Sequence, residues 1–355
     1  MKRLNFTMSA DGDRAMNRTF ILTSILAGVA ACASAPEVLP FDVQAVPSAV
    51  ETEPMAGVGD RADDPAIWVS DTDDQPSLIL GTNKDEGLHV YDLSGKELQF
   101  LNVGAINNVD VRGRYAVASN DEVGALTWFV ISRNAEVPVL HIGNTPVQSV
   151  EPYGVCLGQD DDGLISAITY KDGLVEFWRA DQSKDADISA TLESTLQLPS
   201  QLEGCAFDET QNLIFIGEEA FGLYAYAYRE ADAEPRIIDS IAAGNGLVAD
   251  VEGVSVYFKP NGGYIVASAQ EADRFVVYDR LPPHAPRGIF TVAEGASGGI
   301  DAVSHTDGLD VVAAPLPGYP KGLLVVQDDG NPRSGVDQNF KLVDWQVVSD
   351  ALALD

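Results

Sequence analysis

Six short segments of this chain repeat one pattern, in which an acidic or amide residue leads an apolar run rich in β-branched side chains. They are residues 63–68, 107–111, 151–155, 203–207, 250–256 and 307–312. The segments recur roughly every 45–55 residues, and a fixed period of that size is the sequence signature of a repeat architecture. Each unit must therefore bury its apolar surface against its neighbours.

Each leading run is followed by two further short strands joined by a tight turn. In the first unit these are residues 78–83 and 87–91, and in the third unit they are 165–170 and 174–178. Short apolar or alternating runs broken by Gly, Asp and Asn indicate antiparallel strands, and no segment keeps a helical period. The sequence predicts an all-β fold, a six-bladed β-propeller with four-stranded antiparallel blades.

The charge balance is strongly acidic, with 22 basic and 54 acidic residues, so the net charge is 22 − 54 = −32. Such a surface repels nucleic acid, and we exclude a DNA or RNA partner. We expect a monomer.

The N-terminus has the layout of an export signal. An apolar stretch at 20–29 follows Lys2, Arg3, Arg14 and Arg18, and it is too short to span a membrane. The stretch ends in Val-Ala-Ala-Cys, which resembles a bacterial lipobox with Cys32 as the lipidated residue. We expect a signal peptide at 1–31, a tether at 32–47 and the propeller at 48–355. The location is then the periplasmic face of the outer membrane, or the medium if a plain secretory signal is cut.

Two cysteines remain after removal of the signal peptide. Cys156 and Cys205 both lie in apolar strand runs. We expect buried free thiols.

Propeller topology brings the leading acids close to certain turn residues. The innermost strand of a blade crosses from one face to the other and the second strand returns. The start of the first strand therefore shares a face with the turn between strands two and three. The turn residues concerned are Lys84, Lys171, Glu219, Gln270 and Gln327.

Carboxylates and amides without His or Cys favour a hard cation, calcium first and magnesium second. The chain has only four His, none with a ligand-like partner nearby, so zinc is disfavoured. Calcium bound there can activate water as a nucleophile, and Lys84 and Lys171 can stabilise charge on a transferred phosphoryl group. No Gly-x-Ser-x-Gly, His-Glu-x-x-His or phosphate-loop motif is present.

Several of these segments together resemble the β-propeller phytases, over residues 51–345. The resemblance rests on Asp-Asp-Pro-Ala-Ile-Trp at 63–68, Thr-Asn-Lys at 82–84, Asn-Asn-Val-Asp-Val-Arg at 107–112, Glu-Gly at 203–204, Glu-Glu at 218–219, Asp-Val-Glu-Gly at 250–253 and Gln-Asn-Phe-Lys at 338–341.

This resemblance implies a secreted, calcium-dependent phosphohydrolase of phytate (myo-inositol hexakisphosphate), calcium-phytate and lower inositol phosphates. It implies two neighbouring phosphate sites, one where calcium-activated water attacks and one that holds the substrate. Phosphate contacts would come from Lys84, Tyr153 and Lys171, which with Glu219 form the expected catalytic set. The carboxylates implied as ligands of several Ca²⁺ ions are Glu51, Asp63, Asp64, Asp110, Glu203, Glu219, Asp250, Glu252, Asp301 and Asp307, to which we add the turn amides Gln270 and Gln327.

One position departs from the family pattern. Members usually carry a phosphate-binding arginine after the Ser-Asn pair at 119–120, whereas this chain has Asp121 and Glu122. The change implies weaker phosphate binding, a shifted preference among inositol phosphates, or compensation by another residue such as Arg112.

Two other functions remain open from the sequence. A six-bladed calcium lactonase also uses carboxylates at a propeller channel, although it has no need of Lys84 and Lys171. A non-catalytic propeller with structural calcium is the third possibility.

Overall fold

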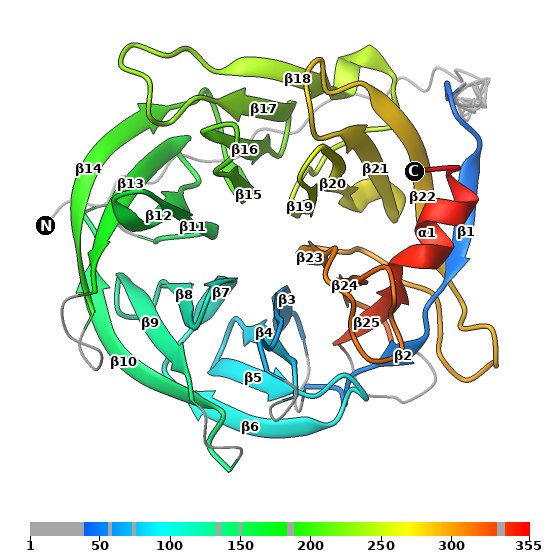
Figure 1. Cartoon of the computed structure of the whole chain (residues 1–355), viewed down its shortest axis with the longest axis horizontal. Helices are drawn as coiled ribbons and strands as arrows, with labels where there is room; N and C mark the ends of the chain where they lie inside the picture. Colours follow the sequence, from blue (N-terminus) through cyan, green and yellow to red (C-terminus); the bar gives the residue numbers. More distant parts are fainter. Residues whose placement is uncertain are drawn as a thin grey trace, which may run out of the picture. The chain divides into compact units, whose positions relative to one another are not determined.

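Six β-sheets stand radially around a central axis and form the blades of a propeller (Figure 1). The computed structural model describes residues 39–355 except 56–58, 73–75, 133–135, 149–150, 183–187 and 332–337. The predicted signal peptide 1–31 and Cys32 lie outside these residues. The predicted six-bladed all-β fold is confirmed.

Blades 1 to 5 follow one another along the chain, each running from the innermost strand outward. Blade 1 holds β3 (Ala62–Trp68), β4 (Leu78–Asn83), β5 (Gly87–Tyr91) and β6 (Glu97–Asn102), and blade 2 holds β7 (Ile106–Arg112), β8 (Tyr115–Asn120), β9 (Ala125–Ile131) and β10 (Val139–Pro146). Blade 3 holds β11 (Val155–Asp160), β12 (Gly163–Thr169), β13 (Leu174–Asp181) and β14 (Ser189–Gln197). Blade 4 holds β15 (Leu202–Asp208), β16 (Leu213–Glu218), β17 (Gly222–Tyr226) and β18 (Arg236–Ser240), and blade 5 holds β19 (Val254–Lys259), β20 (Gly262–Ala269), β21 (Arg274–Asp279) and β22 (Pro286–Ala293).

Blade 6 joins the two ends of the propeller. Its inner strands are β23 (Leu309–Val312), β24 (Leu323–Asp328) and β25 (Asn339–Asp344), and its outermost strand is the N-terminal β2 (Val50–Glu51). A further strand, β1 (Val43–Pro47), pairs in parallel with β22 on the outside of blade 5. The tether expected at 32–47 is therefore too long, because residues 43–47 belong to a sheet.

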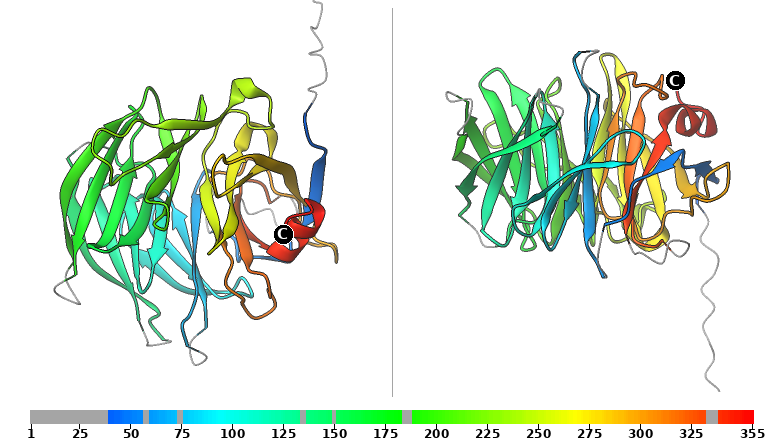
Figure 2. Two further views of the ribbon diagram at one scale, coloured as in Figure 1. Left: turned by 45° about the horizontal axis from the view of Figure 1, so that its top comes forward. Right: turned by 90° about the horizontal axis from the view of Figure 1, so that it is seen from below.

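Helical structure is scarce in the part of the chain that is described. Two 3₁₀ turns, η1 (Ile241–Ala243) and η2 (Gln270–Ala272), and the helix α1 (Trp345–Ala351) are present. The Asp344 side chain caps α1 by accepting the Gln346 N–H, and Trp345 and Val348 pack into the core. Figure 2 shows this short helix close to the C-terminus. Among the described residues no helix is long and apolar enough to cross a membrane.

The hydrophobic core is divided among the six junctions between blades. Each of six apolar clusters combines residues of two neighbouring blades, so the clusters close a full circle. Middle strands such as β4 and β9 are buried on both faces, which explains their continuous apolar runs. The outermost strand β6 alternates between half-buried and exposed residues, because one of its faces meets solvent.

The two cysteines form a disulfide rather than the free thiols that we expected. Cys156 lies on β11 and Cys205 on β15, with an S–S distance of 2.05 Å and a Cα–Cα distance of 5.7 Å. Their separation of 49 residues is about one repeat, so they lie one position apart on neighbouring inner strands. That spacing was the signal in the sequence that our prediction overlooked.

Candidate active site

The inner strands β3, β7, β11, β15, β19 and β23 line the central channel (Figure 1). We number the aligned residues of these strands by position, so that position 1 is Ala62 in blade 1 and its equivalent in each other blade. Position 2 lies within two residues of the start of the strand in every blade, and in blades 1, 2, 4 and 6 it carries the leading acid or amide of the repeat. Its six occupants are Asp63, Asn107, Tyr153, Glu203, Glu252 and Asp307.

Glycines at position 3 let neighbouring inner strands approach each other closely. A Cβ on Gly154 would clash with the Glu203 carbonyl oxygen, and a Cβ on Gly204 would clash with that of Glu252. Only glycine fits such backbone contacts. The close approach brings the position 2 side chains together at one mouth of the channel.

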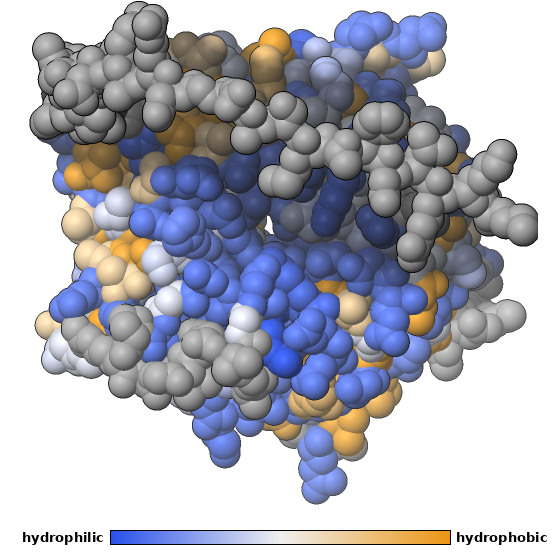
Figure 3. Space-filling view, turned by 180° about the vertical axis from the view of Figure 1, so that it is seen from behind, coloured by the Kyte–Doolittle hydropathy of each residue, from blue (hydrophilic) through white to orange (hydrophobic). Residues whose placement is uncertain are grey.

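Three buried glutamates form the centre of this arrangement. Glu203, Glu219 and Glu252 each offer a carboxylate oxygen, and these atoms lie within 4.8 Å of one another. One oxygen each of Glu203 and Glu219, and both of Asp63, are buried without a hydrogen bond. Buried carboxylate oxygens that lack donors are the expected state of ligands for a hard cation. Hydrophilic side chains also surround the central hollow on the face shown in Figure 3.

Burial and mutual repulsion raise the pKa values of these acids. Burial raises the pKa of Asp63 and of Glu203 well above the usual range. For Glu252, burial first and then the charges of Glu203 and Asp307 raise the pKa to about 12. A cluster of this kind cannot be fully ionised without a cation to balance it.

Lys84 lies among the carboxylates, as the topology predicted. Its Nζ is 3.0 Å from Asp307 Oδ2, 3.1 Å from Asp60 Oδ2 and 3.5 Å from Asp63 Oδ1. Burial alone would lower the pKa of Lys84, but the carboxylates around it outweigh burial and raise the pKa. Lys84 therefore remains a cation in the site.

Gln270 connects two members of the ring. Its Nε2 donates to Glu252 Oε2 at 2.7 Å and also to Asp307 Oδ1. Asp250 also lies close by, since its carbonyl accepts the Gln270 N–H. After burial, its charge helps to raise the pKa of Glu219. Both residues thus lie near the glutamate cluster as expected.

Lys171 and Tyr153 form a second part of the site at the junction of blades 2 and 3. The Lys171 Nζ lies 4.3 Å from the centroid of the Tyr153 ring. A cavity of about 400 Å³ opens beside them. The other residues that line it are Asn107, Asp121, Glu122, Glu151 and Pro152. The two acids that replace the expected arginine thus face the same cavity as Lys171.

Six predicted site residues do not join the ring, and Gln327 is the first. Its Oε1 accepts the Asp307 N–H at 2.9 Å and its Nε2 donates to the Ala62 carbonyl at 3.2 Å. Gln327 is fully buried, and both ends of its amide hold the main chains of blades 6 and 1. We therefore remove it from the proposed ligands.

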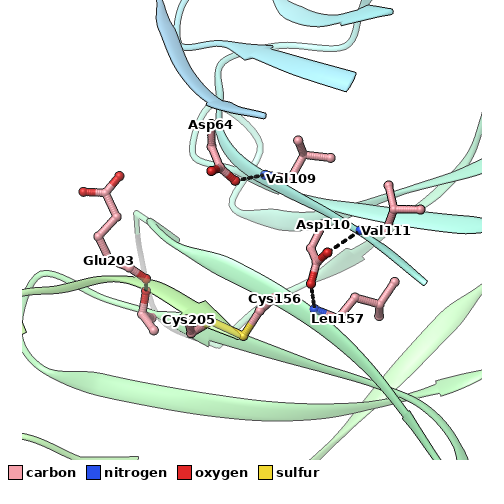
Figure 4. The surroundings of a disulfide bond; sticks show 9 residues. Asp64, Val109, Asp110, Val111, Cys156, Leu157, Glu203 and Cys205 are labelled. Atoms are coloured by element: carbon pink, nitrogen blue, oxygen red, sulfur yellow. Dashed lines mark hydrogen bonds between the residues drawn. A yellow bond between two sulfur atoms is a disulfide. The ribbon is translucent and has the colours of Figure 1, made fainter. Parts of the chain in front are cut away.

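Asp64 and Asp110 lie deeper in the channel and bind main-chain amides. Asp64 Oδ2 accepts the Val109 N–H at 3.1 Å, while Asp110 accepts the N–H groups of Leu157 at 2.7 Å and Val111 at 2.6 Å (Figure 4). They line a channel cavity of about 370 Å³. One oxygen of each binds a main chain of the next blade, and the other Asp110 oxygen binds its own strand, so Asp110 has neither oxygen free for the ring.

Arg112 was wrongly predicted to contact substrate. It ends β7, five residues beyond Asn107, and a strand rises about 3.3 Å per residue, so about 17 Å separate the two. There its guanidinium pairs with Glu209 Oε1 at 2.9 Å. Arg112 cannot compensate for the acids at 121 and 122.

Glu51 and Asp301 form a separate cluster in blade 6 around a buried lysine. Lys341 Nζ lies 2.6 Å from Glu51, 2.8 Å from Asp301 and 3.1 Å from Asp328. Asp301 Oδ2 and Asn339 Oδ1 are buried there without a hydrogen bond. Sequence reasoning assigned no role to Asp328 or Lys341, although a single lysine between Phe340 and Leu342 in β25 was a signal for a buried ion pair.

Comparison with known proteins gives two findings. Residues 14–355 match the family model described as Phytase. The chain is also 32% identical over 323 residues to the 3-phytase of Bacillus subtilis (strain 168), an alignment that covers 85% of this chain and 84% of that relative.

Proposed function

This chain belongs to the phytase family, and we propose that it is a calcium-dependent 3-phytase that releases phosphate from phytate by attack of an activated water molecule. A lactonase or a purely structural propeller is disfavoured by the family match over nearly the whole chain. The observation that carries the calcium proposal is the cluster of Glu203, Glu219 and Glu252, in which Glu203 and Glu219 each have a buried oxygen without a donor.

The residues present fit a calcium site. Calcium takes six to eight oxygen ligands in flexible geometry, and the mouth of the channel supplies carboxylates without nitrogen or sulfur donors. We propose that Glu203, Glu219 and Glu252 hold the ions together with Asp63, Asp307 and Asp250. Calcium bound there would neutralise the ring and lower the pKa of a bound water.

The cationic side chains are proposed to handle the phosphate groups. Lys84 keeps its charge inside the carboxylate ring, so it can bind a phosphate and stabilise the negative charge that develops during transfer. Lys171, held above Tyr153, is proposed to bind a neighbouring phosphate and to orient the inositol ring. Phytate, calcium-phytate and lower inositol phosphates all carry the vicinal phosphates that such a pair would recognise.

The cluster around Lys341 is proposed to have a structural role, separate from turnover. Lys341 already supplies one positive charge to Glu51, Asp301 and Asp328. Asp301 Oδ2 and Asn339 Oδ1, which accept no hydrogen bond, fit as ligands of an additional calcium ion there.

We also propose that the protein is exported, through the segment at 1–31 and with Cys32 as a possible lipid anchor. The Cys156–Cys205 disulfide supports export, because structural disulfides persist in oxidising compartments.

The direct test measures phosphate release from phytate in calcium and after chelation. We expect activity that disappears with chelator and returns when calcium is added back. Glu219→Gln should lower calcium affinity about tenfold or more, whereas the matched Glu209→Gln, at the far end of the channel, should not. A purified protein that binds calcium but releases no phosphate would disprove the proposed function.

A further inference from the structure

A repeated cross-link joins the inner strands of neighbouring blades at position 5. There Asp110 Oδ2 accepts the Leu157 N–H of the next blade at 2.7 Å. In the same way Asp310 Oδ2 accepts the Ile67 N–H at 2.8 Å. The acceptor is the side chain at position 5, and the donor is the main chain at position 6 of the following blade. We call this contact the position 5 latch.

Blade 5 forms a weaker version of the same latch. Its position 5 residue is Ser255, whose Oγ accepts the Val311 N–H at 3.2 Å. The hydroxyl also donates to Asp310 Oδ1 at 2.8 Å. In blades 1 and 4, position 5 is Ala66 and Ala206, and a methyl group cannot accept a hydrogen bond.

Blade 3 has Cys156 at position 5, and here the latch is covalent. Cys156 bonds to Cys205, the position 4 residue of the next inner strand (Figure 4). The disulfide thus links position 5 of one inner strand to the next inner strand, in the same direction as the carboxylate latches at their own junctions. It takes the place that an aspartate holds in blades 2 and 6.

This disulfide is the one position 5 latch that reaches β15 among the described residues. The strand before it, β11, is held on both sides, by Asp110 and by the disulfide. On its other side β15 presents Ala206, which forms no such link to β19. Without the disulfide, β15 would lose its latch at this level.

The strand held in this way carries a central acid of the site. Glu203 precedes Cys205 by two residues and Tyr153 precedes Cys156 by three, so about 7–10 Å of extended chain separates the sulfurs from either residue. The same junction is tightened by Thr169 Oγ1, which donates to the Glu203 carbonyl at 2.7 Å. A shift of β15 would therefore move Glu203 relative to Glu252 and Tyr153.

We propose that the Cys156–Cys205 disulfide is a positioning element of the active site, which holds β15 so that Glu203 keeps its place among the calcium-binding carboxylates. Cys156 and Cys205 act through Glu203 and contact neither calcium nor substrate. The inference rests on the proposed function, because it assigns calcium to this cluster.

A matched pair of variants isolates the latch. Cys156→Ala/Cys205→Val removes it and copies residues found at these positions in other blades, where Ala66 and Ala206 occupy position 5 and Val109 and Val254 occupy position 4. Cys156→Asp/Cys205→Val differs only at residue 156 and supplies a carboxylate that can accept the Phe207 N–H, as Asp110 accepts that of Leu157. Of the two proteins, only the Asp/Val protein can therefore form a position 5 latch at this junction.

Calcium binding to the purified proteins is measured by titration calorimetry at 25 °C, beside the calcium concentration that gives half-maximal phosphate release. We expect the Ala/Val protein to bind calcium at the catalytic site about tenfold more weakly, and the Asp/Val protein to recover most of that loss. If the disulfide only stabilised the fold, its removal would lower Tm and leave both calcium readouts unchanged.

The outcomes separate this inference from the proposed function. Wild-type calcium affinity in the Ala/Val protein overturns the positioning role, and so does an Asp/Val protein as weak as the Ala/Val protein. A wild type that neither binds calcium nor requires it overturns the proposed function instead. If the Ala/Val protein does not fold, Cys156→Ser/Cys205→Val, which copies Ser255 at position 5, takes its place and is expected to bind calcium less tightly than the Asp/Val protein.

Discussion

Lys171 and Arg112 illustrate how two basic side chains on neighbouring blades differ in their chance of meeting substrate. Lys171 faces the cavity beside Tyr153, whereas Arg112 pairs with Glu209 at the other end of β7. We expect Lys171→Ala to raise KM for phytate several-fold with a smaller change in kcat, because a phosphate contact is lost. Arg112→Ala is the matched control and should leave KM unchanged. Equal effects of the two changes on KM would contradict the assignment.

Asp121 should weaken binding of the most highly charged substrate. It lines the cavity beside Lys171 together with Glu122 and Glu151, so three carboxylates oppose one ammonium there. Burial raises the pKa of Asp121, and the charge of Glu151 adds to the rise. Asp121→Asn should lower KM for phytate, and lower it less for inositol phosphates with fewer phosphates. Steady-state kinetics with both substrates tests this, and an unchanged ratio of KM values would contradict it.

The position of a side chain could be predicted from the sequence only where the propeller topology alone determines it. Lys84 was predictable because a strand start and the turn after the second strand share a face in any propeller blade. Gln327 was not, because a glutamine that binds two main chains has the same sequence context as one that binds a metal. The prediction for Asp110 failed for a related reason, because its place in the repeat does not reveal which donor its carboxylate meets.

The position 5 latches between inner strands make the stability of the fold depend on pH. Burial raises the pKa of Asp110 to about 7, although Arg112 and two main-chain N–H groups oppose the rise. An unfolded aspartate titrates near 4, so between about pH 4 and 7 the native state binds more protons. Stability must therefore fall as pH rises through this range.

Asp110→Asn removes that fall. The asparagine keeps one acceptor and loses another, which costs some stability at every pH. Relative to wild type, its free energy of unfolding should increase from pH 4 to pH 7 and then stay constant, because the wild type loses stability over that range. Urea unfolding in chelator at several pH values measures this, with the exposed Asp161→Asn as control. A difference that does not vary with pH would contradict the raised pKa.

The cysteines mark the limit of sequence reasoning about elements. The six repeats and their strands followed from apolar runs and turn residues. The pairing of Cys156 with Cys205 depends on register between strands of different blades, which no local pattern encodes. A comparison of positions from one repeat to the next does reveal it, since both residues lie at neighbouring levels of consecutive inner strands.

The whole propeller should depend on calcium for stability, increasingly so at high pH. Asp63, Glu203 and Glu252 have raised pKa values, so the metal-free native state holds protons that the unfolded chain releases. Stability from those protons is present at low pH and is lost as pH rises. We expect Tm in chelator to fall from pH 5 to pH 9, and saturating calcium to remove most of this fall. A Tm in chelator that rises with pH, or one that calcium does not change, would contradict this.

The closure of blade 6 by β2 also sets the order of events during synthesis. Lys341 and Glu51 are in contact although 290 residues separate them, so the first strand of the blade is made long before its partner. At about 5–20 residues per second, β2 waits roughly 15–60 s for β25 to appear. During that time the face of blade 1 that packs against blade 6 has no partner, and contacts of such long range form slowly. The nascent chain is therefore most exposed to aggregation until its last twenty or so residues have been made, and a late truncation would leave the circle open however well the other blades had folded.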